Sequence, residues 1–352
     1  MSTKLNIAVI MGGPSIEHQV SLNSGANILT GLDPNRYNIL PIIINRQGRW
    51  LFAPEYLNGE NISDRMAQQT TQALNFISFS KPQAAIAYLK EKQPNVVFLA
   101  LHGEYGEDGT IQRLIETARL NYTGSGSLAS ALGMDKPKSL TIFRQHNLLV
   151  PNFVVIETEQ WPDHKEKILR RISKNFKYPL IVKPANRGSS LGVSLANNLT
   201  TLYQGINAAF DTSQHILIQE YINGRELTCA VLGHEPQVIA LPPTEIIPPA
   251  GSFFHYQAKY EAGFSQEITP ANLPTNLIEK TQEAALRCHN ILGCHGLSRT
   301  DFILDAKNRL YTLELNTLPG MTKTSLLPQA ALAAGINFSQ LLDKIISAAV
   351  KK

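Results

Sequence analysis

The feature that most constrains the fold is a set of short aliphatic runs, separated by helical segments, in the first third of the chain. The runs are LNIAVIM (5–11), NILPIII (38–44) and NVVFLAL (95–101). Apolar residues recur at helical spacing between and after them, over 16–30, 82–92 and 110–119. Strands buried on both faces that alternate with helices predict an α/β unit built on a parallel sheet. Ligands of such sheets bind beyond the carboxyl ends of the strands, where Gly12-Gly13 and His102-Gly103 fall.

The rest of the chain predicts two further units of α+β character. The second begins near Gly124 and holds predicted helices at 136–146, 163–176 and 199–210 with strands at 153–156, 179–183 and 215–222. The third holds strands at 226–232 and 237–241, a helix at 274–292 and a hairpin at 297–316. At roughly 100–200 residues per domain, a chain of this length suggests two or three domains. We predict domains at 1–124, 125–218 and 219–352, with a long loop without regular structure at 242–268 that is typical of a functional lid.

Composition excludes several classes of protein. The chain has 32 Lys and Arg against 28 Asp and Glu, a net charge of +4, and its cations are scattered. That distribution disfavours a nucleic-acid-binding surface. Cys229, Cys288 and Cys294 lack the close spacing of a zinc site or a disulfide scaffold, which favours reduced thiols. The N-terminus lacks the pattern of a signal peptide, and no apolar run approaches the ~20 residues that span a bilayer. We therefore expect a cytoplasmic protein with no membrane partner.

The strongest chemical signal is the hairpin predicted at 298–305 and 309–316. Side chains alternate along a strand, so a turn at 306–309 places Asp301 opposite Glu314 and Arg299 opposite Asn316 on one face. Carboxylates that close repel each other unless a cation neutralises them. Oxygen ligands of this kind select Mg²⁺ or Mn²⁺, often together with substrate phosphates. The competing interpretation is a surface hairpin with ordinary charges.

A second signal is the segment Lys183–Gly192, KPANRGSSLG. A predicted strand ends in Lys183 and runs into a Gly/Ser loop whose N–H groups and hydroxyls can surround phosphate oxygens, with the lysine as a point charge. The lysine precedes the glycines and no helix follows, so the segment is not a Walker A motif. Such a loop by itself is more often a simple turn, but the acidic hairpin downstream favours nucleotide binding.

Two shorter segments lie at strand ends of the first unit. In His102–Thr110 the glycines allow close approach to a ligand. Here His102 fits a ligand contact as well as a buried, hydrogen-bonded histidine, while Asp108 and Thr110 suit helix capping. Glu17, after Gly12-Gly13-Pro14, either complements the dipole of the following helix or holds a substrate ammonium group.

Five segments together resemble the D-alanine–D-alanine ligase family. They occur in that family's order over almost the whole chain, as Met11–Ser21, His102–Gln112, Lys183–Gly192, Lys259-Tyr260 and Arg299–Gly320. The resemblance implies an ATP-grasp fold with an N-terminal Rossmann-like domain, a central domain and a C-terminal domain, with ATP between the last two. It implies ATP-dependent ligation of two D-alanine molecules through an acyl phosphate, for peptidoglycan synthesis, by a cytoplasmic homodimer.

The resemblance also implies roles for individual residues. Glu17 would bind the ammonium group of the first D-alanine, and Ser189 and Tyr260 would complete a hydrogen-bonded network to the lid. Arg299 and the N–H of Gly320 would stabilise the oxyanion. Substrate contacts would further include His102, Ser325 and Leu326, the last two at the carboxylate of the second D-alanine. Two Mg²⁺ (or Mn²⁺) ions would be held by Asp301, Glu314 and Asn316. The ATP contacts would be Lys136, Lys183, Ser189, Ser190, Glu220, Tyr221, Ile222, Glu226, Lys259 and Asn316.

Three positions depart from the family's pattern. Arg187 stands where relatives often have an acidic or neutral residue, Thr300 replaces an aliphatic residue, and Gln219–Ile222 replaces a segment that contains Glu-Lys in some relatives. Two alternatives stay open beside D-alanine ligation. One is a ligase that uses D-lactate or D-serine as acceptor, against which Lys259-Tyr260 weighs. The other is a non-catalytic nucleotide-binding protein, against which the intact acidic and cationic residues weigh.

Overall fold

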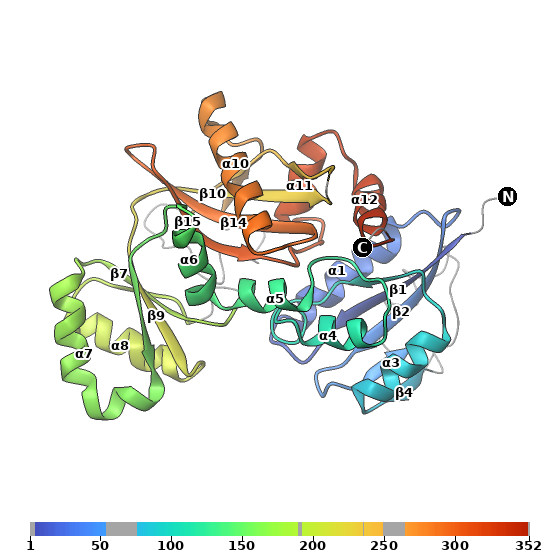
Figure 1. Cartoon of the computed structure of the whole chain (residues 1–352), viewed down its shortest axis with the longest axis horizontal. Coiled ribbons are helices and arrows are strands. Elements are labelled where there is room, and N and C mark those ends of the chain that lie inside the picture. The colour runs from blue at the N-terminus through green and yellow to red at the C-terminus, as the bar shows by residue number, and fades with distance from the viewer. Residues whose placement is uncertain (1–3, 54–75, 189–191, 235, 249–264, 351–352) are drawn as a thin grey trace.

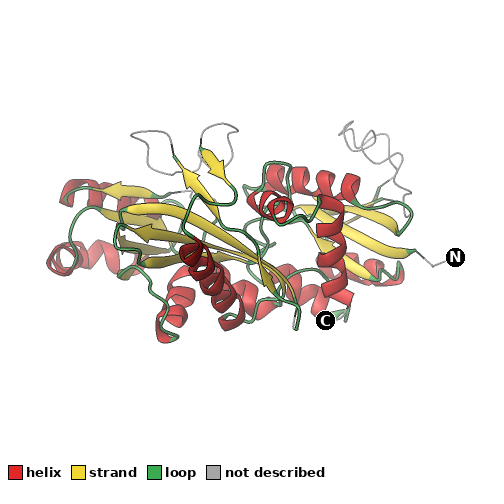
Figure 2. Ribbon diagram, turned by 90° about the horizontal axis from the view of Figure 1, so that it is seen from above, coloured by secondary structure: helices red, strands yellow, loops and turns green. Residues whose placement is uncertain are grey.

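The structure is a computed structural model that describes residues 4–53, 76–188, 192–234, 236–248 and 265–350. Its strands form three sheets, each with covering helices, and the third sheet (β10, β14, β15) lies between the second (β7, β9) and the first (β1, β2) in Figure 1; Figure 2 shows the same elongated molecule from above. Among the described residues, no helix is both long enough and apolar enough to cross a bilayer.

The first sheet confirms the predicted parallel core and extends it at one edge. Its strand order is β4-β3-β2-β1-β5, where β1 pairs in parallel with β2 and β5, and β3 and β4 add antiparallel strands. Ile7, Val9 and Met11 of β1 enter one hydrophobic core while Ala8 and Ile10 enter another, so both faces of the sheet are covered. The elements are β1 (Leu5–Gly12), α1 (His18–Gly31), β2 (Tyr37–Ile44), β3 (Trp50–Phe52), β4 (Ile77–Phe79), α3 (Pro82–Glu91), β5 (Val96–Leu99) and α4 (Thr110–Thr117).

The second sheet is antiparallel, with the order β6-β9-β7-β8. Helices α7 and α8 pack with it around a core that the described residues between 154 and 218 supply by themselves. Two preceding helices, α5 and α6, pack on β15 of the third sheet instead. The elements are α5 (Ser127–Met134), α6 (Lys136–Gln145), β6 (Phe153–Glu157), the 3-10 turn Thr158–Gln160, α7 (Trp161–Asn175), β7 (Leu180–Pro184), β8 (Ser194–Ala196), α8 (Leu199–Phe210) and β9 (His215–Glu220).

The third sheet has the order β13-β12-β10-β14-β15, with β11 paired to β10. Long β10 and β14 pair over ten residues each and form its centre. The elements are β10 (Gly224–Gly233), β11 (Ile239–Ala240), β12 (Thr244–Ile247), β13 (Gln266–Ile268), α10 (Thr275–Ile291), β14 (Gly296–Asp305), β15 (Leu310–Asn316), α11 (Leu326–Ala333) and α12 (Phe338–Val350).

The prediction that 242–268 lacks regular structure is wrong at both ends of the segment. Residues 244–247 and 266–268 form β12 and β13, which pair with each other and continue the third sheet. Strand β12 is tied to β10 by an ion pair: the guanidinium of Arg225 donates two hydrogen bonds of 2.6 Å to the carboxylate of buried Glu245. Alternation over four residues is too short to stand out in a sequence that is rich in proline. The middle of the predicted lid, 249–264, lies outside the described residues.

Helix α12 joins the first sheet to the third. Leu342, Ile345 and Ile346 belong to one continuous core with Val9 of β1 and Leu232 of β10. In Figure 1 this helix lies between the first sheet and the C-terminal strands. The first and third units are therefore locked by apolar packing, and no described residue of 153–218 belongs to that core.

Candidate active site

A cavity of about 280 Å³ lies where the three sheets meet. Its walls come from the start of α1, the loop after β5, α6, the loop after β7, the third sheet and the segment before α11. Many of the lining side chains are charged or hydroxylated. They include Glu17, His102, Glu107, Lys136, Glu226, Glu267, Arg299, Asp301, Glu314, Asn316, Thr317, Thr322, Thr324 and Ser325, with backbone from Gly188 and Gly320.

Glu17 lies at the cavity wall with its residue 5% exposed. It stands immediately before α1 and makes no side-chain capping bond to that helix, so helix capping does not account for it. A Cβ atom at Gly103 would be 2.6 Å from its carboxylate, and one at Gly188 would be 3.0 Å away. Two glycine backbones therefore enclose this carboxylate, one from the first unit and one from the second.

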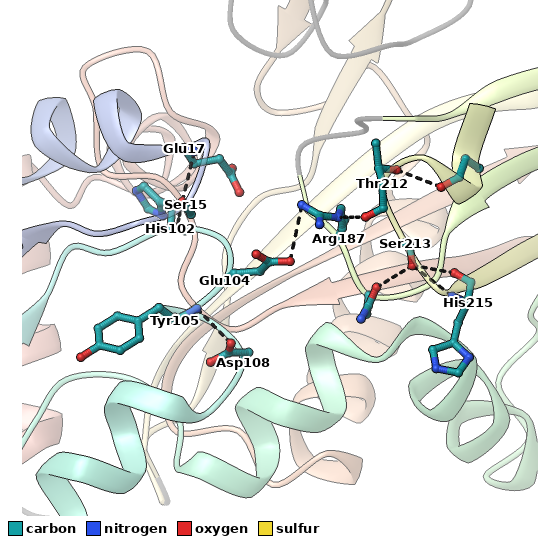
Figure 3. A network of polar contacts seen from close by, with 12 residues as sticks. Ser15, Glu17, His102, Glu104, Tyr105, Asp108, Arg187, Thr212, Ser213 and His215 are labelled. Carbon is teal, nitrogen blue, oxygen red and sulfur yellow. Dashed lines mark hydrogen bonds and ion pairs between the residues drawn. The ribbon is translucent and has the colours of Figure 1, made fainter. Parts of the chain in front are cut away.

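His102 is both hydrogen-bonded and at the cavity, which combines the two predicted interpretations. Its Nε2 lies 2.9 Å from Ser24 Oγ, and its carbonyl accepts a bond from Ser15 Oγ at 2.7 Å (Figure 3). Burial lowers the pKa of the imidazole, and Arg299 acts in the same direction, against the opposing effects of Glu17 and the Leu318 carbonyl. The ring is therefore neutral at pH 7.

Glu107 is the functional candidate that the sequence interpretation missed. Its Oε2 accepts the N–H of Gly103 at 2.7 Å, and its buried Oε1 has no hydrogen-bond partner among the described residues. Burial raises its pKa to about 8, and the carboxyl of Glu17 acts in the same direction; the Gly103 N–H, Arg299 and Lys136 oppose the shift. A neutral carboxyl group thus lies beside Glu17 at pH 7. The sequence did carry a signal for it, since Glu107 lies in a glycine-rich loop at a strand end. The nearby acids Glu104 and Asp108 have other partners, and the sequence does not show which of the three enters the cavity.

The hairpin of β14 and β15 has the predicted pairs at the site. Asp301 lies opposite Glu314, and Arg299 lies opposite Asn316. The turn is one residue shorter than predicted, because Leu304 pairs with Leu310, and a bulge at Leu313 restores the register. Such a bulge re-aims the strand next to the site.

The hairpin carboxylates contact protein cations. Arg299 donates two hydrogen bonds to Asp301, at 2.9 and 3.0 Å, and Thr228 Oγ1 donates a third at 2.6 Å. Lys136 Nζ lies 3.6 Å from Glu314 Oε2. Lys136, at the start of α6, is a residue predicted to contact ATP phosphates. Its ammonium group lies in the cavity wall beside a hairpin carboxylate.

The residues predicted for Mg²⁺ fit a hard cation by their chemistry. Asp301, Glu314 and Asn316 line the same cavity and carry carboxylate and amide oxygens, although Asn316 Oδ1 also accepts the N–H of Leu318 at 2.8 Å. Within the described ranges, no three His, Cys, Asp or Glu side chains cluster tightly enough to hold an ion by themselves. Such a donor set suits Mg²⁺, which keeps waters and takes further oxygens from substrate phosphates.

The segment before α11 forms another wall of the cavity. Ser325 is the N-cap of α11, and its Oγ accepts the N–H of Thr322 at 3.0 Å. A Cβ at Gly320 would be 2.6 Å from that Oγ, so a larger residue there would displace the Ser325 hydroxyl. Ser325 and Leu326 both line the cavity at a helix N-terminus, which suits a carboxylate.

The predicted ATP contacts divide into three groups. Lys136, Glu226 and Asn316 line this cavity. Lys183, Glu220, Tyr221 and Ile222 are not among the residues that line it; Lys183 is buried in β7, and Glu220 accepts a bond from Asn152 Nδ2 at 2.9 Å. Ser189, Ser190, Lys259 and Tyr260 lie outside the described residues.

Comparison with protein families identifies the chain. Models described as the N-terminus and the C-terminus of D-ala D-ala ligase match residues 6–125 and 142–347. The chain belongs to the D-alanine–D-alanine ligase family. A D-alanine–D-alanine ligase of Caldicellulosiruptor bescii is 38% identical over 99% of this chain and 96% of its own length. A D-alanine–D-alanine ligase B of Clostridium tetani is 37% identical over 99% and 94%.

Solved structures of ligases share the fold. The VanG D-Ala:D-Ser ligase from Enterococcus faecalis has a TM-score of 0.84 and 32% identity, with 98% of this chain and 99% of that chain covered. A D-alanine–D-alanine ligase from Bacillus anthracis complexed with ATP has a TM-score of 0.75 and 32% identity, with 99% and 98% covered. The mixed α/β architecture of this family member is thus the ATP-grasp architecture of these ligases.

Proposed function

We infer that the protein ligates two D-alanine molecules to D-alanyl-D-alanine, with ATP converted to ADP and phosphate, for peptidoglycan synthesis. The observation that carries this conclusion is the cavity in which Glu17, Arg299 and the two hairpin carboxylates converge. Its full-length relatives named as D-alanine–D-alanine ligases support the same acceptor. A serine acceptor, as in the name of VanG, has no comparable support from these relatives.

The proposed chemistry has two halves. The carboxylate of the first D-alanine takes the γ-phosphoryl group of ATP, which gives an acyl phosphate. The amine of the second D-alanine attacks that carbonyl, and phosphate leaves. Positioning and charge stabilisation are the main tasks of a protein in such transfers.

We assign the first substrate to Glu17 and the reacting carbonyl to Arg299. The Glu17 carboxylate holds the ammonium group beside neutral His102. Arg299 and the N–H of Gly320 stabilise the oxyanion, since the Asp301 contacts fix the guanidinium at the cavity wall. Ser325 and Leu326 receive the carboxylate of the second D-alanine. Ser189 and Tyr260 complete the network over the first substrate.

We assign ATP to the side of the cavity formed by the second and third units. Lys136, Lys183 and Lys259 meet its phosphates, and Glu226 meets its ribose. The remaining contacts come from Ser189, Ser190, Glu220, Tyr221, Ile222 and Asn316. Asp301, Glu314 and Asn316 hold two Mg²⁺ or Mn²⁺ ions, which neutralise phosphate charge when bound.

The proposal extends to the arrangement of the molecule. An N-terminal Rossmann-like domain (1–124), a central domain (125–218) and a C-terminal domain (219–352) enclose the site. Two copies form a homodimer in the cytoplasm, where ATP and D-alanine are available.

The test is an acceptor screen of the purified protein with ATP and Mg²⁺. Phosphate release and product mass are measured with D-alanine alone and with D-alanine plus D-serine, D-lactate or L-alanine. We expect phosphate release in step with D-alanyl-D-alanine in the first mixture, and little mixed product in the others. Mixed D-alanyl-D-serine or D-alanyl-D-lactate as the main product would overturn the proposed acceptor, and ATP hydrolysis without any dipeptide would overturn the ligase function.

A further inference from the structure

Arg187 is at a junction of three elements. Its carbonyl accepts a hydrogen bond from Lys136 Nζ of α6 at 2.5 Å. Its Nε donates to the carbonyl of Thr212, between α8 and β9. Its NH1 lies 3.5 Å from Glu104 Oε1, in the loop after β5 of the first unit (Figure 3). The guanidinium of Arg187 therefore contacts both the second unit, at Thr212, and the first unit, at Glu104.

The next residue makes a second contact between the same two units. Gly188 approaches the Glu17 carboxylate so closely that a Cβ there would lie 3.0 Å from it. Arg187 and Gly188 are consecutive in the chain, and Glu104 and Glu17 are both in the first unit. The position of Gly188 over Glu17 is therefore coupled to the contact of Arg187 with Glu104.

Apolar packing does not fix this approach. The second unit has its own core, and its described residues contribute nothing to the cores on either face of the first sheet. Its apolar contact is with the third sheet, where Leu217 packs with Leu227 and Phe302. The direct contacts between the second unit and the first that are described above are therefore the polar ones at Arg187 and the close approach of Gly188. A single ion pair between the two units can then change how closely Gly188 approaches Glu17.

We propose that the ion pair of Glu104 and Arg187 positions Gly188 against Glu17 and so tightens binding of the first D-alanine. Both are positioning residues, which act through Gly188 and not on the reacting atoms. The proposal rests on the proposed function.

The pair is partly open to water, with side chains 32% and 52% exposed for Arg187 and Glu104. Screening by salt therefore weakens it. The expected consequence is a salt-dependent affinity for D-alanine, with little change in the affinity for ATP. If Arg187 bound an ATP phosphate instead, its loss would weaken ATP and the loss of Glu104 would not.

The test compares Glu104→Gln, Arg187→Gln, the double variant and the exchanged pair Glu104→Arg/Arg187→Glu. The matched control is Glu166→Gln with Arg170→Gln, an exposed ion pair at 3.2 Å on α7 of the same unit. We measure kcat and the separate KM values for ATP and for D-alanine at the first site, at low and high salt. Small-angle scattering of the nucleotide-free proteins reports closure without turnover.

Each single variant should raise KM for D-alanine about two- to fivefold at low salt, as expected for a partly exposed pair. The double variant should be no worse than either single one, the exchanged pair should recover at least part of the affinity, and the control should match wild type. High salt should remove the difference between wild type and variants. Scattering should show more open single variants.

Two results would overturn the proposal. Additive effects of the two single variants on KM for D-alanine would show that the residues act independently. A raised KM for ATP in Arg187→Gln alone would assign Arg187 to the nucleotide. If wild type made no dipeptide, the ligase function would fail by itself, and equal scattering of wild type and variants would then reject the ion pair separately.

Discussion

At the scale of single residues, the site is defined by how burial sorts three neighbouring acids. Glu104, Glu107 and Asp108 lie within five positions in one loop. Asp108 accepts the N–H groups of Tyr105 and Thr110 at 2.9 Å each, and Glu104 reaches Arg187. Glu107 alone of the three turns into the cavity, where burial beside Glu17 keeps it protonated. Three carboxyl groups of one loop therefore differ in role: Asp108 stabilises the loop, Glu104 contacts the second unit, and Glu107 retains its proton.

The raised pKa of Glu107, about 8 against an ordinary 4.5, predicts a pH-dependent stability. Between these values the unfolded chain has released the proton that the folded chain retains, so stability falls as pH rises through this window. Glu107→Gln removes the ionisation. Its free energy of unfolding relative to wild type should therefore increase from pH 5 to pH 8, by about 3 kcal/mol.

Urea unfolding at pH 5, 6.5 and 8 measures this difference. Glu166→Gln, at an exposed position of α7, serves as control and should show no such trend. A constant difference between Glu107→Gln and wild type over this range would contradict the assignment of a protonated Glu107.

At the scale of elements, the hairpin of β14 and β15 combines two tasks. The bulge at Leu313 keeps Glu314 opposite Asp301, while the turn is stabilised at its far end by Asp305, which accepts the N–H groups of Lys307 and Arg309 at 2.9 and 2.8 Å. The acidic end contributes charge to the cavity, and the turn end contributes stability. A hairpin with ends that differ in this way allows the two contributions to be separated by mutation.

Glu314→Gln should lower kcat by about 100-fold or more. Loss of a residue that orients a metal ligand typically reduces activity by about 10- to 100-fold, and loss of the ligand itself should cost at least as much. The loss of its charge leaves Lys136 with an amide neighbour, and the shape of the side chain is kept. The melting temperature without ligands should therefore change little. Phosphate release and calorimetry measure the two effects.

Asp305→Asn, at the turn end of the partner strand β14 in the same hairpin, is the matched comparison. It weakens the turn, so it should lower the melting temperature and leave kcat close to wild type. Normal ATP-dependent turnover in Glu314→Gln would remove Glu314 from the proposed metal site.

At the scale of the whole molecule, the chain is divided by its hydrophobic cores and not by the order of its segments. The last helix, α12, packs into the core of the first sheet, so the two ends of the chain share one core. The second unit keeps a core of its own beneath α7 and α8. Leu217 of β9 also packs into the core of the third sheet with Leu227 and Phe302, so the second unit is joined to the third by apolar contacts and contributes nothing to the described cores of the first sheet.

This division predicts how core mutations spread. Leu342→Ala in α12 should cost about 2–5 kcal/mol and reduce hydrogen-exchange protection in both β1 and β10, because one core supports both strands. Leu202→Ala in α8 should cost a similar amount and reduce protection in β7 and β9. Protection lost in β1 after Leu202→Ala, or confined to β10 after Leu342→Ala, would contradict separate cores.

Local pattern was sufficient for most of the elements and for the identity of the acidic hairpin. Aliphatic runs and helical spacing depend on which side chains are adjacent along a strand or helix, so 5–11, 38–44 and the hairpin pairs could be predicted without the fold. The antiparallel edge strands β3 and β4 and the short strands β12 and β13 could not. Strands of three or four residues carry too little periodicity, and they form because a longer neighbour offers free backbone groups.

The sequence by itself determined the type of fold and the family, and it singled out Glu17, Arg299, Asp301 and Glu314, all of which line the cavity. These residues lie in contiguous segments with a strong local pattern. Only the tertiary structure decided which acid of the loop after β5 enters the cavity, which carboxylate Lys136 faces, and what Arg187 bridges. Each of these depends on burial and charge from segments that are distant in the chain. The pKa of Glu107 responds to burial and to Glu17, Arg299 and Lys136, which are distant in the chain and meet only once it has folded.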